Sequence, residues 1–176
     1  MFGLSPSWSR QVSRQILSAI VLASVVVPLA PGAWQTPFTP PAAEASSYIQ
    51  KEIASLKKSQ QRWIEIDLSS QRLIAWEGKR WVDAKIVSTG KASTPTRTGV
   101  FEIQEKFRSV TMKGADYEVP DVPHAMFYSG NYAIHGAYWH SSFGTPVSHG
   151  CVNMAPDAAQ WLYSWARVGT PIVIHD

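Results

Sequence analysis

Apolar and polar residues alternate from Arg62 onward, and this period of two is the pattern that most restricts the fold of the chain. In the segment RWIEIDL, Ile64 and Ile66 point to one face of an extended chain and Glu65 points to the other. Short turns separate this segment from two further alternating segments, RLIAW and RWVDAKIV. The sequence therefore predicts three consecutive antiparallel strands, followed by a fourth in GVFEIQEKF.

The remainder of the chain completes a mainly β domain of about 115–130 residues with one packed C-terminal helix. Residues 108–123 show no period, which predicts a long loop or a loose hairpin, and such connections often form lids or binding surfaces. Two short aromatic strands, HAMFY and NYAIH, follow around a turn. PDAAQWLYSWAR predicts the helix, because its proline suits a first helical turn and Gly169 stops it, and TPIVI predicts a closing strand.

The first 45 residues predict an export signal followed by a spacer. A basic, Ser-rich start leads into an apolar run at 16–30, which contains Pro28 and is shorter than the roughly 20 residues of a membrane span. Small residues suit cleavage at 32–33 and, preferably, at 43–45. A chain that stays uncut would be tethered by this segment to the outer face of the membrane.

We therefore expect residues 1–45 to be a signal peptide, or an uncleaved anchor, with a Pro/Ala-rich spacer. Residues 46–61 are expected to be a short helical or linker lead-in, and 62–176 to be the folded domain, a monomer in the periplasm or the cell-wall space. From Ser46 on, 14 Lys and Arg stand against 12 Asp and Glu. This small surplus argues against nucleic acid as a partner.

The chain holds a single cysteine, Cys151, so it cannot form an internal disulfide. An unpaired thiol in an oxidising compartment suggests a residue kept for its reactivity, and the reactive form is the thiolate, whose reference pKa is about 8.5. A reactive site should depress that pKa through a neighbouring histidine. His149 can approach the thiol only if the chain stays extended, whereas His135 ends a predicted strand, so the geometry favours His135 as the base.

Gly150 precedes the cysteine and lacks a Cβ, so the backbone can turn sharply there and expose its amides. We expect the N–H groups of His149, Gly150 and Cys151 to converge as an oxyanion hole just before a helix N-terminus. This pattern is typical of acyl transfer by a cysteine and a histidine.

The segment IHG at 134–136, followed by SHGCVN at 148–153, resembles the catalytic signature of the L,D-transpeptidase (YkuD-like) domain family. VSTG at 87–90, a Thr-Pro followed by Gly-Val-Phe at 94–101, and the terminal GTPIVI are similar to other landmarks of that domain and occur in the same order. The resemblance covers about 62–174. It implies a β-rich catalytic fold with the cysteine near a helix start and no cofactor.

The resemblance implies Cys151 as the nucleophile and His135 as the base, its ring oriented by a main-chain carbonyl. It also implies a two-step reaction on peptidoglycan stem peptides. Attack on the acyl carbonyl of the third residue of a tetrapeptide expels D-alanine, and an amine of a second stem then gives a 3→3 cross-link. Carbapenems would be covalent inhibitors. Five residues beside the pair are expected to form the oxyanion hole or otherwise support the site: Ser148, His149, Gly150, Gly136 and Asn153. Asn153 stands in a position where many members have arginine.

Several alternatives remain. In one alternative, water resolves the thioester in place of an amine, and the protein is an L,D-carboxypeptidase or endopeptidase. In another, the domain binds cell wall without chemistry. For the thiol, the alternatives are an inert core residue and a zinc ligand together with His135, His140 and His149, although their spacings fit no strong zinc motif. Outside that alternative, His140 is expected to be an ordinary polar residue. Three aromatic residues are candidates for the substrate groove or for packing: Tyr128, Tyr138 and Trp139.

Overall fold

The computed structural model describes residues 42–114 and 117–176, all of which belong to one compact unit. The predicted export signal and spacer, up to residue 41, lie outside the described residues. The preferred cleavage site at 43–45 falls in the first turn of helix α1 (Ala42–Lys58). Across the described ranges, no helix combines the length and the apolar character that a membrane crossing requires.

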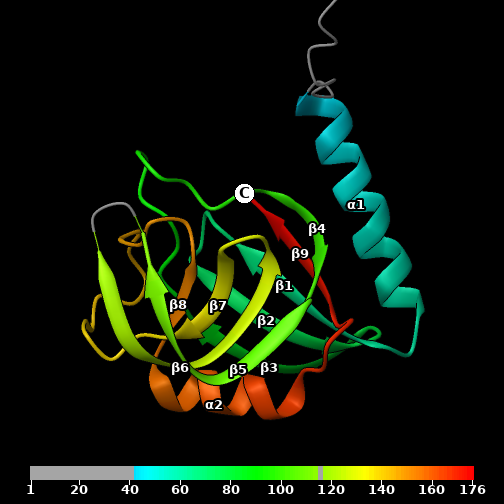
Figure 1. Ribbon diagram of the computed structural model, residues 1–176. Coiled ribbons are helices and arrows are strands. Elements are labelled where there is room, and N and C mark those ends of the chain that lie inside the picture. The colour runs from blue at the N-terminus through cyan, green and yellow to red at the C-terminus, as the bar shows by residue number, and fades with distance from the viewer. Residues whose placement is uncertain (1–41, 115–116) are drawn as a thin grey trace, which may run out of the picture. The chain divides into compact units, whose positions relative to one another are not determined.

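Five strands form the first sheet, in the order β3-β2-β1-β9-β4 (Figure 1). The three consecutive antiparallel strands predicted from the alternation are confirmed, and the closing strand is inserted beside the first of them in parallel, with Ile64 opposite Ile172. The bounds are β1 Arg62–Asp67, β2 Arg72–Glu77, β3 Arg80–Ile86, β4 Gly99–Glu102 and β9 Pro171–His175.

The prediction of one fourth strand in GVFEIQEKF is wrong, because the segment is divided between two sheets. β4 pairs with β9 in the first sheet, and β5 (Glu105–Lys113) belongs to the second. The crossing is fixed by backbone hydrogen bonds on both sides: Ile103 donates to the carbonyl of Thr170 at 3.0 Å, and Gln104 donates to that of Phe127 at 2.8 Å. Ile103 is fully buried at the crossing, so the chain changes sheets in the core.

Four strands form the second sheet, in the order β5-β6-β7-β8. Residues 108–123 lie mostly in the antiparallel pair of β5 and β6, so the hairpin alternative for this segment is confirmed. β8 was not predicted, and it pairs in parallel with β7. The bounds are β6 Glu118–Ser129, β7 Tyr132–Gly136 and β8 Val152–Met154.

Helix α2 (Pro156–Trp165) packs against β6 and β7 and contributes Leu162 to the main core. It ends at Trp165, four residues before the glycine expected to stop it, because the backbone becomes extended at Ala166. The Lys106 ammonium donates to the carbonyls of Tyr163 and Ala166, each at 2.6 Å. The expected mainly β fold with a packed C-terminal helix is confirmed.

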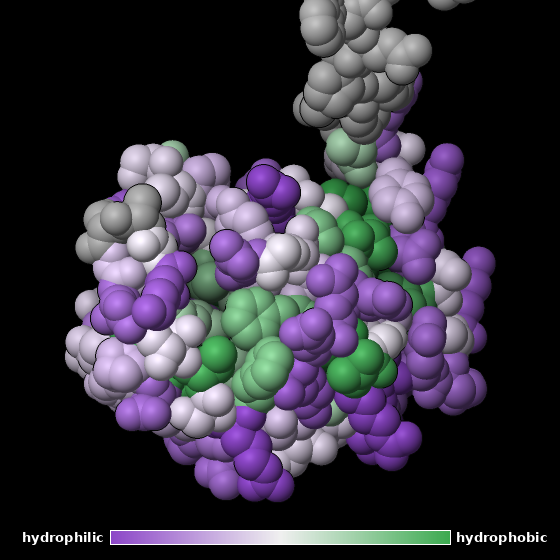
Figure 2. Space-filling model, in the orientation of Figure 1, coloured by the Kyte–Doolittle hydropathy of each residue, from purple (hydrophilic) through white to green (hydrophobic). Residues whose placement is uncertain are grey.

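The lead-in predicted at 46–61 contains most of α1, which packs on the first sheet across β9 and β4. Leu56 and two isoleucines of the helix meet Trp63 and Val173 in a second buried cluster. Figure 2 shows apolar side chains gathered beside α1, and a second apolar group near the middle of the same face. β1 is therefore buried on both faces near Trp63, and the domain has a second packed helix.

We predict that Leu56→Ala lowers the free energy of unfolding by about 2–4 kcal/mol, because the side chain is 1% exposed and its removal leaves a cavity against the sheet. Ser55→Ala on the exposed side of the same helix is the matched control and should change it by less than about 0.5 kcal/mol. Urea unfolding measures both. Equal values for the two variants would show that α1 does not stabilise the domain.

Candidate active site

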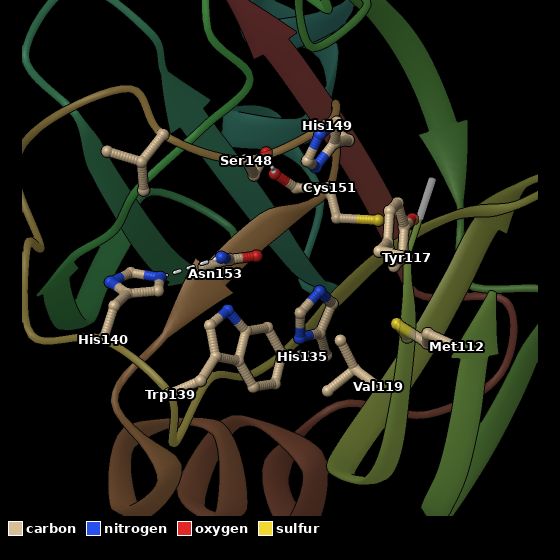
Figure 3. Close-up of a pocket in the computed structure, with 11 residues that line it drawn as sticks. Met112, Tyr117, Val119, His135, Trp139, His140, Ser148, His149, Cys151 and Asn153 are labelled. Atoms are coloured by element: carbon tan, nitrogen blue, oxygen red, sulfur yellow. Dashed lines mark hydrogen bonds between the residues drawn. The ribbon is translucent and has the colours of Figure 1, made fainter. Parts of the chain in front are cut away.

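Cys151 and His135 both line a pocket of about 280 Å³ at the end of the second sheet (Figure 3). One wall comes from the β5–β6 hairpin, and the other walls come from β7, β8 and the segments that precede and follow them. The remaining lining residues are Met112, Tyr117, Val119, Trp139, His140, Val147, Ser148, His149 and Asn153.

The parallel pairing of β7 and β8 brings the two residues together. His135 lies opposite Asn153 in the register, and Cys151 comes two residues before Asn153. Side chains two residues apart on an extended chain share a face, so Cys151, Asn153 and His135 face the same side. Figure 3 shows the thiol and the imidazole projecting into one cavity from neighbouring strands.

His135 is 3% exposed, and its ring is fixed by one hydrogen bond and one stacking contact. Nδ1 lies 3.0 Å from the carbonyl oxygen of Gly136, which can only accept, so Nδ1 carries the proton and Nε2 has a free lone pair. Trp139 stacks on the ring with centroids 5.7 Å apart. Burial lowers the pKa of His135 to about 4, so the ring is neutral at pH 7 and can accept a proton at Nε2.

The thiol of Cys151 donates to the carbonyl of Asn131 over 3.7 Å. Burial raises its pKa above the ordinary value, and a backbone hydrogen bond from Ala133 offsets this in part. The expectation of a depressed thiol pKa is therefore wrong for the free site. Both shifts favour the neutral thiol beside the neutral imidazole.

Ser148 holds the turn that presents Cys151. Its hydroxyl donates to the Cys151 carbonyl at 2.5 Å and accepts from the Gly150 N–H at 3.0 Å. Two threonines of the TPTRTG loop clamp the same turn: Thr94 Oγ1 donates to the Ser148 carbonyl at 3.0 Å, and Thr96 Oγ1 donates to the Gly150 carbonyl at 2.9 Å. These four hydrogen bonds hold the backbone that presents the cysteine side chain.

The backbone conformation at Gly150 has a φ of +113°, which favours glycine, and a Cβ there would lie 2.5 Å from Cε1 of Tyr132. The predicted sharp turn is therefore present, but its use differs from the expectation. The Gly150 N–H is bound by Ser148, so it is not offered to an oxyanion. β8 stands between Cys151 and α2, so the helix does not begin beside the cysteine. An oxyanion role for the amides of His149 and Cys151 stays a prediction.

The other predicted site residues differ in their burial and in their contacts with the pair. His149 is exposed at the pocket rim, with Nε2 3.4 Å from the Lys91 ammonium and its ring 5.0 Å from that of Tyr117. Gly136 supplies the carbonyl that orients His135, and a Cβ there would lie 2.9 Å from Cγ of Pro123. Asn153 is buried in the pocket wall, where its side chain meets His140.

Of the three aromatic candidates for the groove, only Trp139 lines this pocket. Tyr128 is 1% exposed and packs in the main core with Phe101, so it belongs to the packing alternative. Tyr138 is exposed, and its hydroxyl donates to the carbonyl of Pro120 at 2.7 Å. Among the described residues, no group of three or more His, Cys, Asp or Glu could hold a metal ion, so the structure does not support the zinc alternative.

Comparison with known proteins decides the family. A model of the L,D-transpeptidase catalytic domain (YkuD) matches residues 61–174. The chain belongs to the L,D-transpeptidase catalytic domain family. This confirms the resemblance inferred from the histidine and cysteine motifs.

Relatives of the chain are themselves named L,D-transpeptidases. L,D-transpeptidase 2 of Mycobacterium tuberculosis is 36% identical over 97 residues, which are 47% of this chain and 23% of that protein. The catalytic domain of the E. faecium L,D-transpeptidase, solved by NMR, has 28% identity and a TM-score of 0.60 over 66% of this chain and 98% of that one. A solved L,D-transpeptidase in complex with imipenem has 28% identity and a TM-score of 0.61, over 65% and 58%. The chain spans less than half the length of the curated relatives it matches.

Several residues of this transpeptidase-family site were missed from the sequence. Met112, Tyr117 and Val119 come from the β5–β6 hairpin, and the only signal for them was that long connections often form binding surfaces. Thr94 and Thr96 act on the turn from a loop more than fifty residues away in sequence. No local pattern reveals such a contact.

Gly150→Ala should destabilise the protein by about 2–4 kcal/mol, because the new Cβ combines an unfavourable φ with a clash against Tyr132. Gly130→Ala is the matched control: its φ is +54° with no atom within 4 Å, so only the backbone strain of about 1–2 kcal/mol applies. Urea unfolding compares the two. An equal loss in both variants would contradict the close contact at Gly150.

Acid should destabilise the fold partly through His135. Its pKa falls from the ordinary 6.5 to about 4 on folding, so the unfolded chain binds more protons in this window and stability decreases as the pH falls through it. Burial also lowers the pKa of His124 and His140. His135→Gln should therefore remove part of the acid sensitivity, measured by urea unfolding at about pH 7 and about pH 4.5. An unchanged difference between the two pH values would refute this assignment.

Proposed function

We propose that the protein is an exported cysteine L,D-transpeptidase that acts on peptidoglycan stem peptides. The observation that carries the proposal is the pair of Cys151 and His135, which face one pocket from adjacent parallel strands with the imidazole Nε2 left unprotonated. Membership of the L,D-transpeptidase catalytic domain family supports the reaction class. A module that only binds cell wall has no need of both residues.

The first step acylates the cysteine. Sγ of Cys151 attacks the carbonyl carbon of the third residue of a stem tetrapeptide while its proton passes to Nε2 of His135. Collapse of the tetrahedral intermediate breaks the amide bond, the proton moves to the leaving nitrogen, and D-alanine departs. Because thiol and imidazole are both neutral beforehand, proton transfer accompanies the attack.

In the second step an amine attacks the thioester. When the amine is the side chain of the third residue of a second stem, the product is a 3→3 cross-link and the thiol regains its proton. The β5–β6 hairpin and Trp139 supply apolar walls beside the thiol. Walls that close over a bound substrate would keep water from the thioester and favour the amine over hydrolysis. The basic start and apolar run before residue 31 support export to the periplasm or cell-wall space, where the stem peptides lie.

Cys151→Ala should abolish D-alanine release from purified tetrapeptide muropeptides, and His135→Ala should slow it by roughly 10²–10⁴-fold through loss of the general base.

Wild-type protein incubated with a carbapenem should gain the mass of one drug molecule, as the imipenem complex of a relative supports. Mass spectrometry of products and of intact protein measures both.

The products separate the related activities. Cross-linked dimers support the transpeptidase, whereas stems that are only shortened would make the protein a carboxypeptidase with the same thioester. Intact stems together with an unmodified protein mass would contradict thioester chemistry altogether. Ser141→Ala, an exposed change near the pocket, is the matched control and should behave as wild type.

A further inference from the structure

Asn153 and His140 form a pair in the pocket wall for which the reaction proposed above has no role. Asn153 is 3% exposed, and one atom of its side-chain amide lies 2.9 Å from Nε2 of His140. Figure 3 shows the other amide atom pointing away from His140, toward the side of the pocket where Cys151 and His135 lie. That inner atom is buried and has no hydrogen-bond partner among the described residues.

The backbone around His140 decides which amide atom faces it. The N–H of Ser142 donates to Nδ1 of His140 at 3.2 Å, so Nδ1 acts as an acceptor. A neutral imidazole with an accepting Nδ1 carries its proton on Nε2. Burial lowers the pKa of His140, which keeps the ring neutral at pH 7. Nε2 is then a donor and requires an acceptor opposite it.

The two ends of an asparagine amide have nearly the same shape, so their partners determine which is oxygen and which is nitrogen. With Nδ2 toward His140, as drawn in Figure 3, two N–H groups would face each other while Oδ1 stayed unbonded. The reverse orientation places Oδ1 against the Nε2–H and satisfies His140 completely. It also turns the two N–H groups of Nδ2 into the pocket.

The segment around this pair is held firmly enough to keep the orientation. Ser88 and Asn153 exchange two backbone hydrogen bonds, at 2.8 and 2.9 Å. The Ser88 hydroxyl donates to the Ser142 carbonyl at 2.8 Å, which ties the loop carrying His140 to the same strand. Phe143 packs on the His140 ring with centroids 5.0 Å apart.

We propose that His140 is a positioning residue: its Nε2–H holds Oδ1 of Asn153, so that the amide Nδ2 faces the pocket and binds an acceptor oxygen of the acyl donor. This inference rests on the proposed function for the identity of the acyl donor. In this orientation the buried Oδ1 gains a partner, and the N–H groups of Nδ2 are directed to the side of the pocket where Cys151 and His135 lie. The carbonyl and carboxylate oxygens of a stem peptide have the chemistry it requires.

The orientation itself is tested in the wild-type protein without any substrate. Long-range ¹H–¹⁵N spectra of uniformly labelled protein at about pH 7 distinguish the two neutral histidine tautomers. We expect the Nε2–H form for His140 and the opposite Nδ1–H form for His135, which provides an internal reference. An Nδ1–H form for His140 would overturn the proposal whatever the protein's activity proves to be.

The coupling is tested by a double-mutant cycle of His140→Phe and Asn153→Asp, read as the rate of acylation by a carbapenem. Each single variant should slow acylation roughly tenfold, as loss or misdirection of one buried hydrogen bond predicts. The double variant should be no slower than Asn153→Asp alone, and His140→Gln, which keeps an N–H donor, should restore most of the rate. Additive effects would refute action through Asn153.

Alkylation by iodoacetamide provides the control readout, since this small neutral reagent needs the thiol and not the amide. Its rate should be nearly the same in wild type and in the two His140 variants, whereas a collapse of the fold would change it; the carboxylate of Asn153→Asp opposes the thiolate, so that variant is left out of this control. If wild-type protein is alkylated but is not acylated by the drug, the proposed function fails. The tautomer measurement still decides the orientation of Asn153 in that case.

Discussion

The parallel pairing of β7 and β8 is the constraint on which the site depends. Parallel neighbours cannot be joined by a tight turn, so the chain must leave the end of β7 and return to the start of β8 through a long connection. That connection carries Trp139, His140 and the turn before Cys151, and it closes around the space above the two strands. The same pairing that builds the sheet therefore places His135, Cys151 and the wall between them around one pocket.

The pairing fixes the strands but not the direction of the thiol, which depends on a separate set of hydrogen bonds. The hydroxyls of Thr94, Thr96 and Ser148 donate to three backbone carbonyls of the turn, those of Ser148, Gly150 and Cys151 respectively. Their hydroxyls satisfy backbone groups that a tight turn would otherwise leave unpaired in a buried place. The loop from 94 to 99 therefore belongs to the site, although none of its side chains lines the pocket.

The sequence predicted the features that depend on the order of neighbouring residues along the chain. The alternation from Arg62 located the first three strands, and the spacing of histidine, glycine and cysteine pointed to two residues that the fold brings to one pocket. The sequence failed where a contact distant along the chain decides the outcome. In the sequence Ile103 continues the alternation of one strand, but hydrogen bonds to Thr170 and Phe127, both distant along the chain, hold the two sides of the crossing in different sheets. Residues 108–123 lack a clear period because a register shift near Val110 interrupts the alternation.

The thiol pKa was misjudged for a related reason. A histidine beside a cysteine suggests an ion pair, because position in the sequence carries no measure of burial. In the folded chain both groups lie in an apolar wall, and desolvation opposes charge on each of them. The pair therefore remains neutral until a substrate carbonyl is present to accept the developing charge. Under the proposed function, the low polarity that suppresses ionisation in the free site would also strengthen the hydrogen bonds made to a tetrahedral intermediate, so one physical property would both keep the unpaired thiol neutral and favour its reaction with an acyl group.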